Sequence, residues 1–252
     1  MRAADALAAM RELPVADLQA IDGGKTALLL APHADDESLG CGGFIAEACA
    51  RGRPPRVLVL TDGAGSHPNS RLFPPTRLRA LRQEEARDAT AILGLPSHRL
   101  SFLSLPDTAA PTSGEEFDQA VRSITALCEG CGLVLAPWRH DPHCDHEAAH
   151  LMAVAAAEMA GVRHLAYPVW GWTLSDDVSL PGPAPTGWRL RVDQHLPAKR
   201  RAIAAHTSQH SDLIADDPEG FRLPAGLLAV FDQPYETFLR VDQAKATPNP
   251  SD

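Results

Sequence analysis

The sequence predicts an α/β fold, a Rossmann-like sandwich in which a mostly parallel sheet carries helices on both faces. The main observation is that short apolar runs alternate with longer amphipathic stretches along most of the chain. With 252 residues, 44% of them hydrophobic, the chain can bury the core of one such domain and is too apolar to be disordered. We expect a single domain over residues 1–243 and a polar, disordered tail over 244–252.

Each element of this fold follows from a local pattern. Short runs rich in Leu and Val predict buried strands, and apolar residues at every third or fourth position predict helices. Gly94, after the longest amphipathic stretch, is typical of a helix end. The predicted strands are 25–31, 56–61, 99–103, 132–136, 164–169, 188–192 and 236–241, and the predicted helices are 45–51, 77–93, 115–128, 146–160 and 197–208.

The overall charge and the cysteine count exclude several classes of protein. The 32 acidic and 23 basic residues give a net charge of −9, which argues against binding of nucleic acid, since that requires clustered Lys and Arg. Charged residues interrupt residues 1–21, and no apolar run approaches the ~20 residues of a membrane helix. We therefore expect no export signal and no stable membrane insertion. Five cysteines, an odd number, predict no disulfide framework and favour a cytoplasmic location.

Two clusters of His and Asp follow two of the predicted strands. The segment 32–37 (PHADDE) follows strand 25–31, and the segment 140–146 (HDPHCDH) follows strand 132–136. In a parallel sheet these strand ends share one edge, where ligands bind. The first segment by itself could be a solvated loop that caps a helix. Together, however, the clusters supply the imidazole and carboxylate groups that bind Zn²⁺ or a similar divalent ion, and a cation would offset the repulsion between the carboxylates.

Other motifs in the same regions indicate different chemistry. Residues 146–150 read HEAAH, the signature of zincin peptidases, but no clear third ligand follows and the first cluster would have no function. Residues 143–146 match the end of the metallo-β-lactamase pattern, although Asp141 stands where that pattern needs His. Gly40, Gly42 and Gly43 do not have the spacing of a dinucleotide-binding turn, and we interpret them as close packing of a helix on a strand.

The paired clusters resemble the AHPDDE and HPDH motifs of the zinc-dependent deacetylases of the LmbE/PIG-L family. The resemblance extends from about residue 25 to residue 240 and includes Thr61-Asp62-Gly63, the RQEE segment at 82–85 and the HTSQ segment at 206–209. Two prolines of the family motifs are displaced or replaced. Pro32 precedes the first His instead of following it, and Cys144 takes the place of the Pro in HPDH.

The resemblance implies a fold of the same class and a hydrolase that removes an acetyl or other acyl group from an N-acetylglucosamine-like glycoconjugate or small metabolite. Asp35 would be the general base, His143 would face the reacting oxygen as a cation or hydrogen-bond donor, and Asp145 would orient His143 or a metal ligand. One Zn²⁺ ion per chain, or another divalent metal, would be held by His33, Asp36 and His146.

Further side chains at the same edge of the sheet are candidates for contact with the substrate, although each could also be an ordinary packed or solvated residue. They are His67, Arg82, Trp138, Arg139, Trp172 and His206. A non-catalytic protein that only binds metal or sugar remains an alternative, because both motifs carry substitutions. Tryptophans near the Pro/Gly-rich loop 180–187 are compatible with a homo-oligomer.

Overall fold

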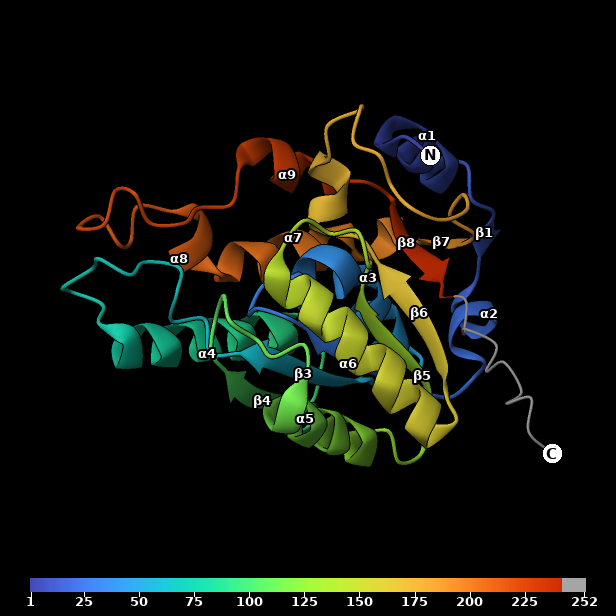
Figure 1. Ribbon diagram of the computed structural model, residues 1–252, viewed down its shortest axis with the longest axis horizontal. Helices are drawn as coiled ribbons and strands as arrows, with labels where there is room; N and C mark the ends of the chain where they lie inside the picture. The colour runs from blue at the N-terminus through green and yellow to red at the C-terminus, as the bar shows by residue number, and fades with distance from the viewer. Residues whose placement is uncertain (242–252) are drawn as a thin grey trace.

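Eight strands form one sheet that lies between two layers of helices (Figure 1). The computed structural model describes residues 1–241, and the tail expected from residue 244 lies outside them. The strand order is β1-β7-β8-β6-β5-β2-β3-β4, and every neighbouring pair is parallel except the two that involve β8. The predicted α/β class is therefore confirmed. The strands are β1 (Val15–Ala16), β2 (Thr26–Ala31), β3 (Arg56–Thr61), β4 (Leu100–Leu105), β5 (Cys131–Pro137), β6 (Arg163–Tyr167), β7 (Gly187–Arg191) and β8 (Tyr235–Arg240).

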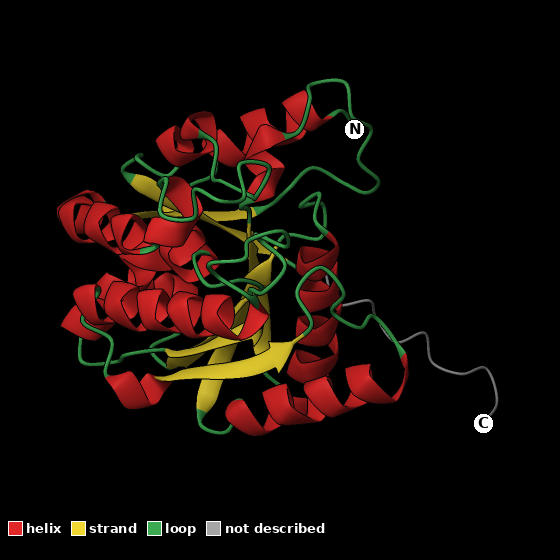
Figure 2. Ribbon diagram, turned by 90° about the vertical axis from the view of Figure 1, so that its left-hand side faces the viewer, coloured by secondary structure: helices red, strands yellow, loops and turns green. Residues whose placement is uncertain are grey.

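Helices cover both faces of the sheet, as Figure 2 shows. The α-helices are α1 (Ala3–Arg11), α2 (Leu18–Asp22), α3 (Asp36–Ala50), α4 (Pro75–Ile92), α5 (Gly114–Leu127), α6 (Cys144–Ala160), α7 (Leu196–Ala205), α8 (Thr207–His210) and α9 (Ala225–Val230). Short 3-10 helices are η1 (Ser97–Arg99), η2 (Trp170–Thr173) and η3 (Asp193–His195). Residues of α2, α3, α4 and α7 share one apolar core, and residues of α5 and α6 share the other. Within residues 1–241, no helix has the length and apolar character to cross a membrane.

The central strands are buried on both faces, which explains why their sequences do not alternate between apolar and polar residues. β2 reads TALLLA and β3 reads RVLVLT, and both strands bury every residue after the first. Leu28 and Leu30 contribute to the core beneath α5 and α6, whereas Leu29 contributes to the core beneath α3. Burial of such side chains supplies about 1.5–3 kcal/mol each, and it fixes the register that brings the ends of β2 and β5 together.

Helix α3 packs closely against its neighbours because it carries glycines on its inner side. A Cβ atom at Gly40 would lie 2.3 Å from Tyr167 Cδ2, and one at Gly43 would lie 2.5 Å from Val192. Real Cβ atoms do not approach other atoms so closely, so glycine is required at both positions. Gly40 packs on Tyr167 of β6 and Gly43 on Val192 just after β7, which supports the interpretation of close helix–strand packing at these two positions. Gly42 instead faces Lys199 of helix α7.

The structure departs from the expected elements in several places. The helix expected over 45–51 begins at Asp36 as α3, because residues 36–48 are buried throughout and show no amphipathic pattern, and α9 forms where the sequence predicts no element. The sequence predicts no element before residue 25, but α1, β1 and α2 form there, because α1 buries Leu7 and Met10 in a cluster with Trp138. The expected helix 197–208 is divided at His206 into α7 and α8, and the Glu85 carboxylate accepts a hydrogen bond from the Ser208 N–H of α8 (2.7 Å). Strand β8 is antiparallel to its neighbours, a direction that burial patterns alone do not reveal.

Candidate active site

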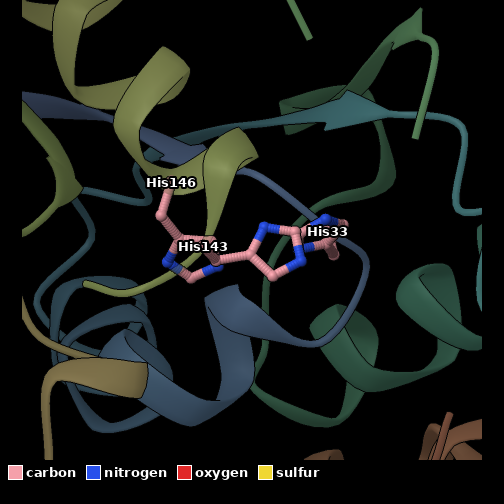
Figure 3. A group of neighbouring side chains, drawn as sticks. All are labelled: His33, His143 and His146. Carbon is pink, nitrogen blue, oxygen red and sulfur yellow. The ribbon is translucent and has the colours of Figure 1, made fainter. Parts of the chain in front are cut away.

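The three expected metal ligands lie together at the edge of the sheet. His33 follows β2, Asp36 opens α3 and His146 lies in the first turn of α6. Asp36 Oδ2 is 3.3 Å from His33 Nδ1 and 3.3 Å from His146 Nε2. All three residues are buried, and Figure 3 shows the two imidazoles beside that of His143. The carboxyl ends of β2 and β5, which are distant in the sequence but adjacent in the sheet, thus bring these residues together, as the sequence predicts.

Hydrogen bonds determine which ring nitrogens can act as metal ligands. His146 Nδ1 lies 2.9 Å from Asp141 Oδ2, and because a carboxylate only accepts, the proton of His146 is on Nδ1. When the ring is neutral, His146 Nε2 carries the lone pair, and this nitrogen is buried and makes no hydrogen bond within residues 1–241. His33 Nε2 donates in the same way to Asp145 Oδ2 (3.0 Å), so a neutral His33 has its lone pair on Nδ1, the nitrogen that faces Asp36 Oδ2. When both rings are neutral, two imidazole lone pairs and a carboxylate oxygen face one another, an arrangement that fits a divalent cation.

The protonation states of the histidines and carboxylates in this cluster depend strongly on one another. Burial by itself lowers the pKa of His33, but its hydrogen bonds to Asp107, Asp145 and Asp36 outweigh burial and raise that pKa well above the ordinary value. Burial also opposes ionisation of Asp36, yet the positive charge of His146 holds the pKa of Asp36 well below its usual range. Without a metal, protonated imidazoles therefore carry the positive charge beside these carboxylates. A divalent cation would take the place of the two protons and leave both rings neutral.

Two carboxylates to which the sequence assigns no role hold the imidazoles in place. Asp141 accepts hydrogen bonds from His146 Nδ1 and from three consecutive backbone N–H groups, those of residues 169, 170 and 171 (2.7–3.0 Å). Asp107, in the loop after β4, has Oδ1 3.3 Å from His33 Nε2. Asp141 belongs to the second sequence cluster, residues 140–146, so the sequence indicates its region although not its role. Asp107 stands alone in its loop, and no sequence pattern points to it.

Asp35 lies next to the ligand cluster in a strained backbone conformation. Its φ of 148° is in the region that favours glycine, and such strain costs about 1–3 kcal/mol and is typical of functional sites. Arg82 Nη2 lies 3.4 Å from Asp35 Oδ2 and donates to the carbonyl of Ala34 (2.8 Å). Burial raises the pKa of Asp35 to about 7, with Arg82 opposing and the charge of Asp36 adding to the effect. A carboxyl group with this pKa can both accept and return a proton near neutral pH.

His143 lies at the N-terminus of α6, where its Nδ1 accepts a hydrogen bond from the Asp145 N–H (3.2 Å). Burial and the neighbouring imidazoles of His33 and His146 lower the pKa of His143 to about 4. The ring is therefore neutral with its proton on Nε2, where it can donate a hydrogen bond. Nitrogens of His33, His143 and His146 lie within 4.8 Å of one another, so a three-histidine ligand set is a geometric alternative. In that set a neutral His143 would lack a lone pair on Nε2.

Asp145 contacts His143 only through its backbone N–H, and its carboxylate is directed to His33. The same carboxylate accepts hydrogen bonds from the N–H groups of Thr108 (2.7 Å) and Ala110 (3.0 Å). The sequence suggests that Asp145 orients either His143 or a metal ligand, and these contacts favour the second role, with His33 as the ligand.

A small pocket of about 120 Å³ opens above these residues. Arg82 lines it, as expected for a substrate-contacting residue, and so does His143. Two aromatic residues that the sequence did not single out, Trp170 and Phe221, also line the pocket, with ring centroids 5.8 Å apart. These aromatic rings belong to η2 and to the loop after α8, segments that only the fold brings together.

Five other expected substrate contacts lie elsewhere. His206 is fully buried behind the pocket, with Nε2 2.9 Å from Glu37 Oε1, and His67 is buried beside Gly220. Trp138 is 6% exposed and packs against α1, where its apolar surface is covered. Arg139 is exposed outside the pocket, and Trp172 belongs to the wall of a separate cavity.

The HEAAH segment does not assemble a peptidase site. His150 directs Nδ1 to the carbonyl of Pro137 (3.1 Å), and its ring packs against His164 with centroids 5.3 Å apart. Glu147, which would be the general base of a zincin, is exposed on α6. His146 alone of the three residues joins the ligand cluster.

Comparison with known proteins agrees with this geometry. A family model described as "PIG-L: GlcNAc-PI de-N-acetylase" matches residues 28–157, just over half of the chain and the part that contains both clusters. The chain belongs to the PIG-L family. The match also bears out the resemblance seen in the sequence, and with it membership of a family of amide hydrolases.

Individual relatives are more distant. The chain is 30% identical over 139 residues to a diacetylchitobiose deacetylase of Thermococcus kodakarensis, a match of 55% of this chain but only 51% of that protein, so the chain spans about half its length. It is 28% identical to a 1D-myo-inositol 2-acetamido-2-deoxy-alpha-D-glucopyranoside deacetylase of Rhodococcus jostii, over 72% of this chain and 80% of the relative. The solved N,N'-diacetylchitobiose deacetylase of Pyrococcus horikoshii superposes with a TM-score of 0.65 over 93% of this chain and 90% of that one, at 20% identity, which supports the fold.

Proposed function

We propose that this PIG-L family member is a metal-dependent deacetylase that hydrolyses the acetamido group of an N-acetylglucosamine-like glycoconjugate or metabolite. The proposal depends above all on one observation: His33 Nδ1 and His146 Nε2 both lie 3.3 Å from the Asp36 carboxylate, beside a strained, buried carboxyl group, that of Asp35. Named relatives that deacetylate diacetylchitobiose and a glucosaminyl inositol support an amino-sugar amide as substrate.

In this proposal His33, Asp36 and His146 hold one Zn²⁺ ion or a similar divalent metal. When bound, the ion supplies Lewis-acid chemistry, because it polarises a carbonyl oxygen and makes water more acidic. The other residues have separate tasks. Asp141 keeps the Nε2 lone pair of His146 directed inward, and Asp145 does the same for the Nδ1 lone pair of His33.

Asp35 accepts the proton of the water that attacks the amide carbonyl, and it returns this proton to the nitrogen of the departing amine. Arg82 holds the Asp35 carboxylate and the Ala34 carbonyl in position. His143 is neutral, and its Nε2–H donates a hydrogen bond to the carbonyl oxygen as negative charge develops there. Trp170 and Phe221 at the wall of the pocket offer aromatic surface to a sugar ring, and the pocket volume of about 120 Å³ favours a short acyl group such as acetyl.

The decisive test replaces Asp35 by Asn and measures acetate release from 4-nitrophenyl N-acetyl-glucosaminide together with the zinc content of the protein. Loss of the general base should lower kcat by about 10²–10⁴-fold while the metal stays bound. The matched control is Glu147→Gln, which makes the same chemical change in the exposed carboxylate of HEAAH and should leave the activity intact. Full activity of Asp35→Asn would overturn the mechanism, and loss of activity in Glu147→Gln would indicate a zincin.

The ligand set is tested separately by metal titration. Asp36→Asn should weaken zinc binding strongly, whereas His143→Ala should keep the metal and lose rate. The opposite result, metal retained in Asp36→Asn and lost in His143→Ala, would favour the three-histidine set. Saturable binding of metal and sugar with no turnover on any acylated amino sugar would favour the non-catalytic alternative.

A further inference from the structure

A second and larger cavity adjoins the catalytic pocket. Its volume is about 510 Å³, compared with about 120 Å³ for the catalytic pocket, and Leu39 of α3 lines both. Trp170 and Trp172, which belong to the same short helix η2, line one pocket each. The walls of the larger cavity come from the end of α1, from η2, α7, β7 and β8, and Figure 1 shows α1 beside the amber segment that follows β6. No role in the proposed hydrolysis falls to this cavity.

Among the described residues, Glu236 is the one carboxylate in the wall of this cavity, and it is already neutralised. Glu236 forms an ion pair with Lys199 (2.6 Å), and both residues are almost completely buried. Glu236 also accepts hydrogen bonds from the N–H groups of Gly43 and Phe44, each at 2.7 Å. A carboxylate with an ammonium and two N–H groups as partners cannot balance further positive charge.

Two guanidinium groups in the same wall have no such balance. Arg11 forms no side-chain hydrogen bond or ion pair within residues 1–241. In the same part of the chain Arg189 has one side-chain hydrogen bond, from Nε to the carbonyl of Leu13 (2.8 Å). Arg11 lies over the ring of Trp172 at 5.7 Å, and Arg189 lies over Tyr235 at 4.8 Å. Each arginine therefore stands on an aromatic face, with donors left for a planar anion.

The remaining lining is mainly apolar, with Leu39, Val230 and Phe231 among its residues. An apolar wall combined with two unbalanced guanidinium groups suits a ligand that has an apolar body and one anionic group. We propose that this cavity binds an amphipathic organic anion, with Arg11 and Arg189 pairing its carboxylate or phosphate and the aromatic walls covering its apolar body.

Such an anion has two chemical sources. Because Leu39 lines both pockets, the anion can be the aglycone of an amino sugar that is bound in the catalytic pocket. In that case this inference rests on the proposed deacetylase function. The anion can also be a free acid that binds independently of the reaction. The binding experiment below needs no turnover, so a failed deacetylase proposal would not affect its result.

The experiment titrates the full-length protein with 2-naphthoate, 2-naphthyl phosphate and the neutral analogue 2-naphthol, followed by calorimetry and by tryptophan fluorescence. Arg11→Met and Arg189→Met should each weaken binding of the two anions about ten- to a hundredfold and leave binding of 2-naphthol unchanged. The matched control is Arg191→Met, also on β7, because Arg191 is exposed and paired with Asp193 outside the cavity. Arg11 is exposed on α1, so Arg11→Met preserves the test if Arg189→Met fails to fold.

A kinetic arm distinguishes the two sources. The KM values of 4-carboxyphenyl and phenyl N-acetyl-glucosaminide are compared in the wild type and in Arg11→Met. A rise in KM for the carboxyphenyl glycoside alone identifies the substrate's aglycone as the ligand, and naphthoate binding with both KM values unchanged identifies a free acid. Equal affinity for naphthoate and naphthol, or anion affinities that neither arginine variant changes, would overturn the proposal.

Discussion

Replacement of Asp141 by Asn tests whether this buried carboxylate holds the metal ligand His146. The carboxylate accepts four hydrogen bonds, one from His146 Nδ1 and three from backbone N–H groups, with Gly171 N at 2.7 Å from Oδ1 and the other three donors on Oδ2. Asn has a single acceptor oxygen. If that oxygen takes the Oδ2 position, the amide NH₂ faces the Gly171 N–H and leaves a buried donor unsatisfied.

The size of the effect follows from these bonds. An unsatisfied buried donor costs about 1–3 kcal/mol, and bonds to a neutral acceptor have roughly half the strength of bonds to a charged one. We therefore expect the free energy of unfolding of the metal-free protein to fall by about 3 kcal/mol, measured by urea denaturation. Because His146 also loses the anion that fixes its tautomer, zinc affinity should fall about 10–100-fold in competition with a chromophoric chelator.

The control for this prediction is Asp177→Asn, an identical change at an exposed position shortly after η2. It should alter neither quantity. If Asp141→Asn unfolds within about 0.5 kcal/mol of the wild type and binds zinc equally well, the assigned role of Asp141 is wrong.

Two further predictions concern the body of the fold. Burial, aided by nearby His150, lowers the pKa of His164 to about 3. As the pH falls below about 6.5, the unfolded chain therefore binds a proton at His164 that the folded chain does not bind, and the free energy of unfolding decreases. His164→Leu should remove this loss, a relative gain of about 2 kcal/mol between pH 7 and pH 5 in urea denaturation, and an unchanged pH profile would contradict the buried neutral state. Gly40→Ala would bring a Cβ atom to 2.3 Å from Tyr167 and should cost about 1–3 kcal/mol, whereas Gly226→Ala, with open space around it in α9, should be neutral or slightly stabilising by thermal unfolding. Equal melting temperatures of the two glycine variants would refute the packing argument.

Much of the sheet was visible in the sequence because parallel strands are buried on both faces and appear as continuous apolar runs. The expected strand 56–61 coincides with β3, and the expected helix 77–93 nearly coincides with α4, which ends where Gly94 adopts a positive φ. The N-terminal elements were not visible. Helix α1 gains its stability from contacts with Trp138 and Leu239, residues far along the chain, and no local pattern reports such contacts.

The candidate ligands were visible for a related reason. His33 and Asp36 are three residues apart, and His143 and His146 are three residues apart, so each pair is a short-range pattern tied to one strand end. The residues that hold these ligands are spread more widely. Asp107 contacts His33 from the loop after β4, and Asp141 accepts hydrogen bonds from the N–H groups of residues 169–171, about thirty residues further along the chain. Neither contact follows from a short sequence spacing, so neither could be predicted from the sequence.

By itself, the sequence determined the α/β class, the alternation of strands and helices, and the pair of His/Asp clusters at strand ends, because burial period and local spacing are properties of neighbouring residues. The tertiary structure decided which nitrogen of each imidazole is free, because that depends on carboxylates from other loops. It also decided that Trp170 and Phe221, rather than Trp138 and Trp172, line the catalytic pocket. Which side chains face a common space depends on how the loops pack over the sheet, and long-range packing has no local signature in the chain.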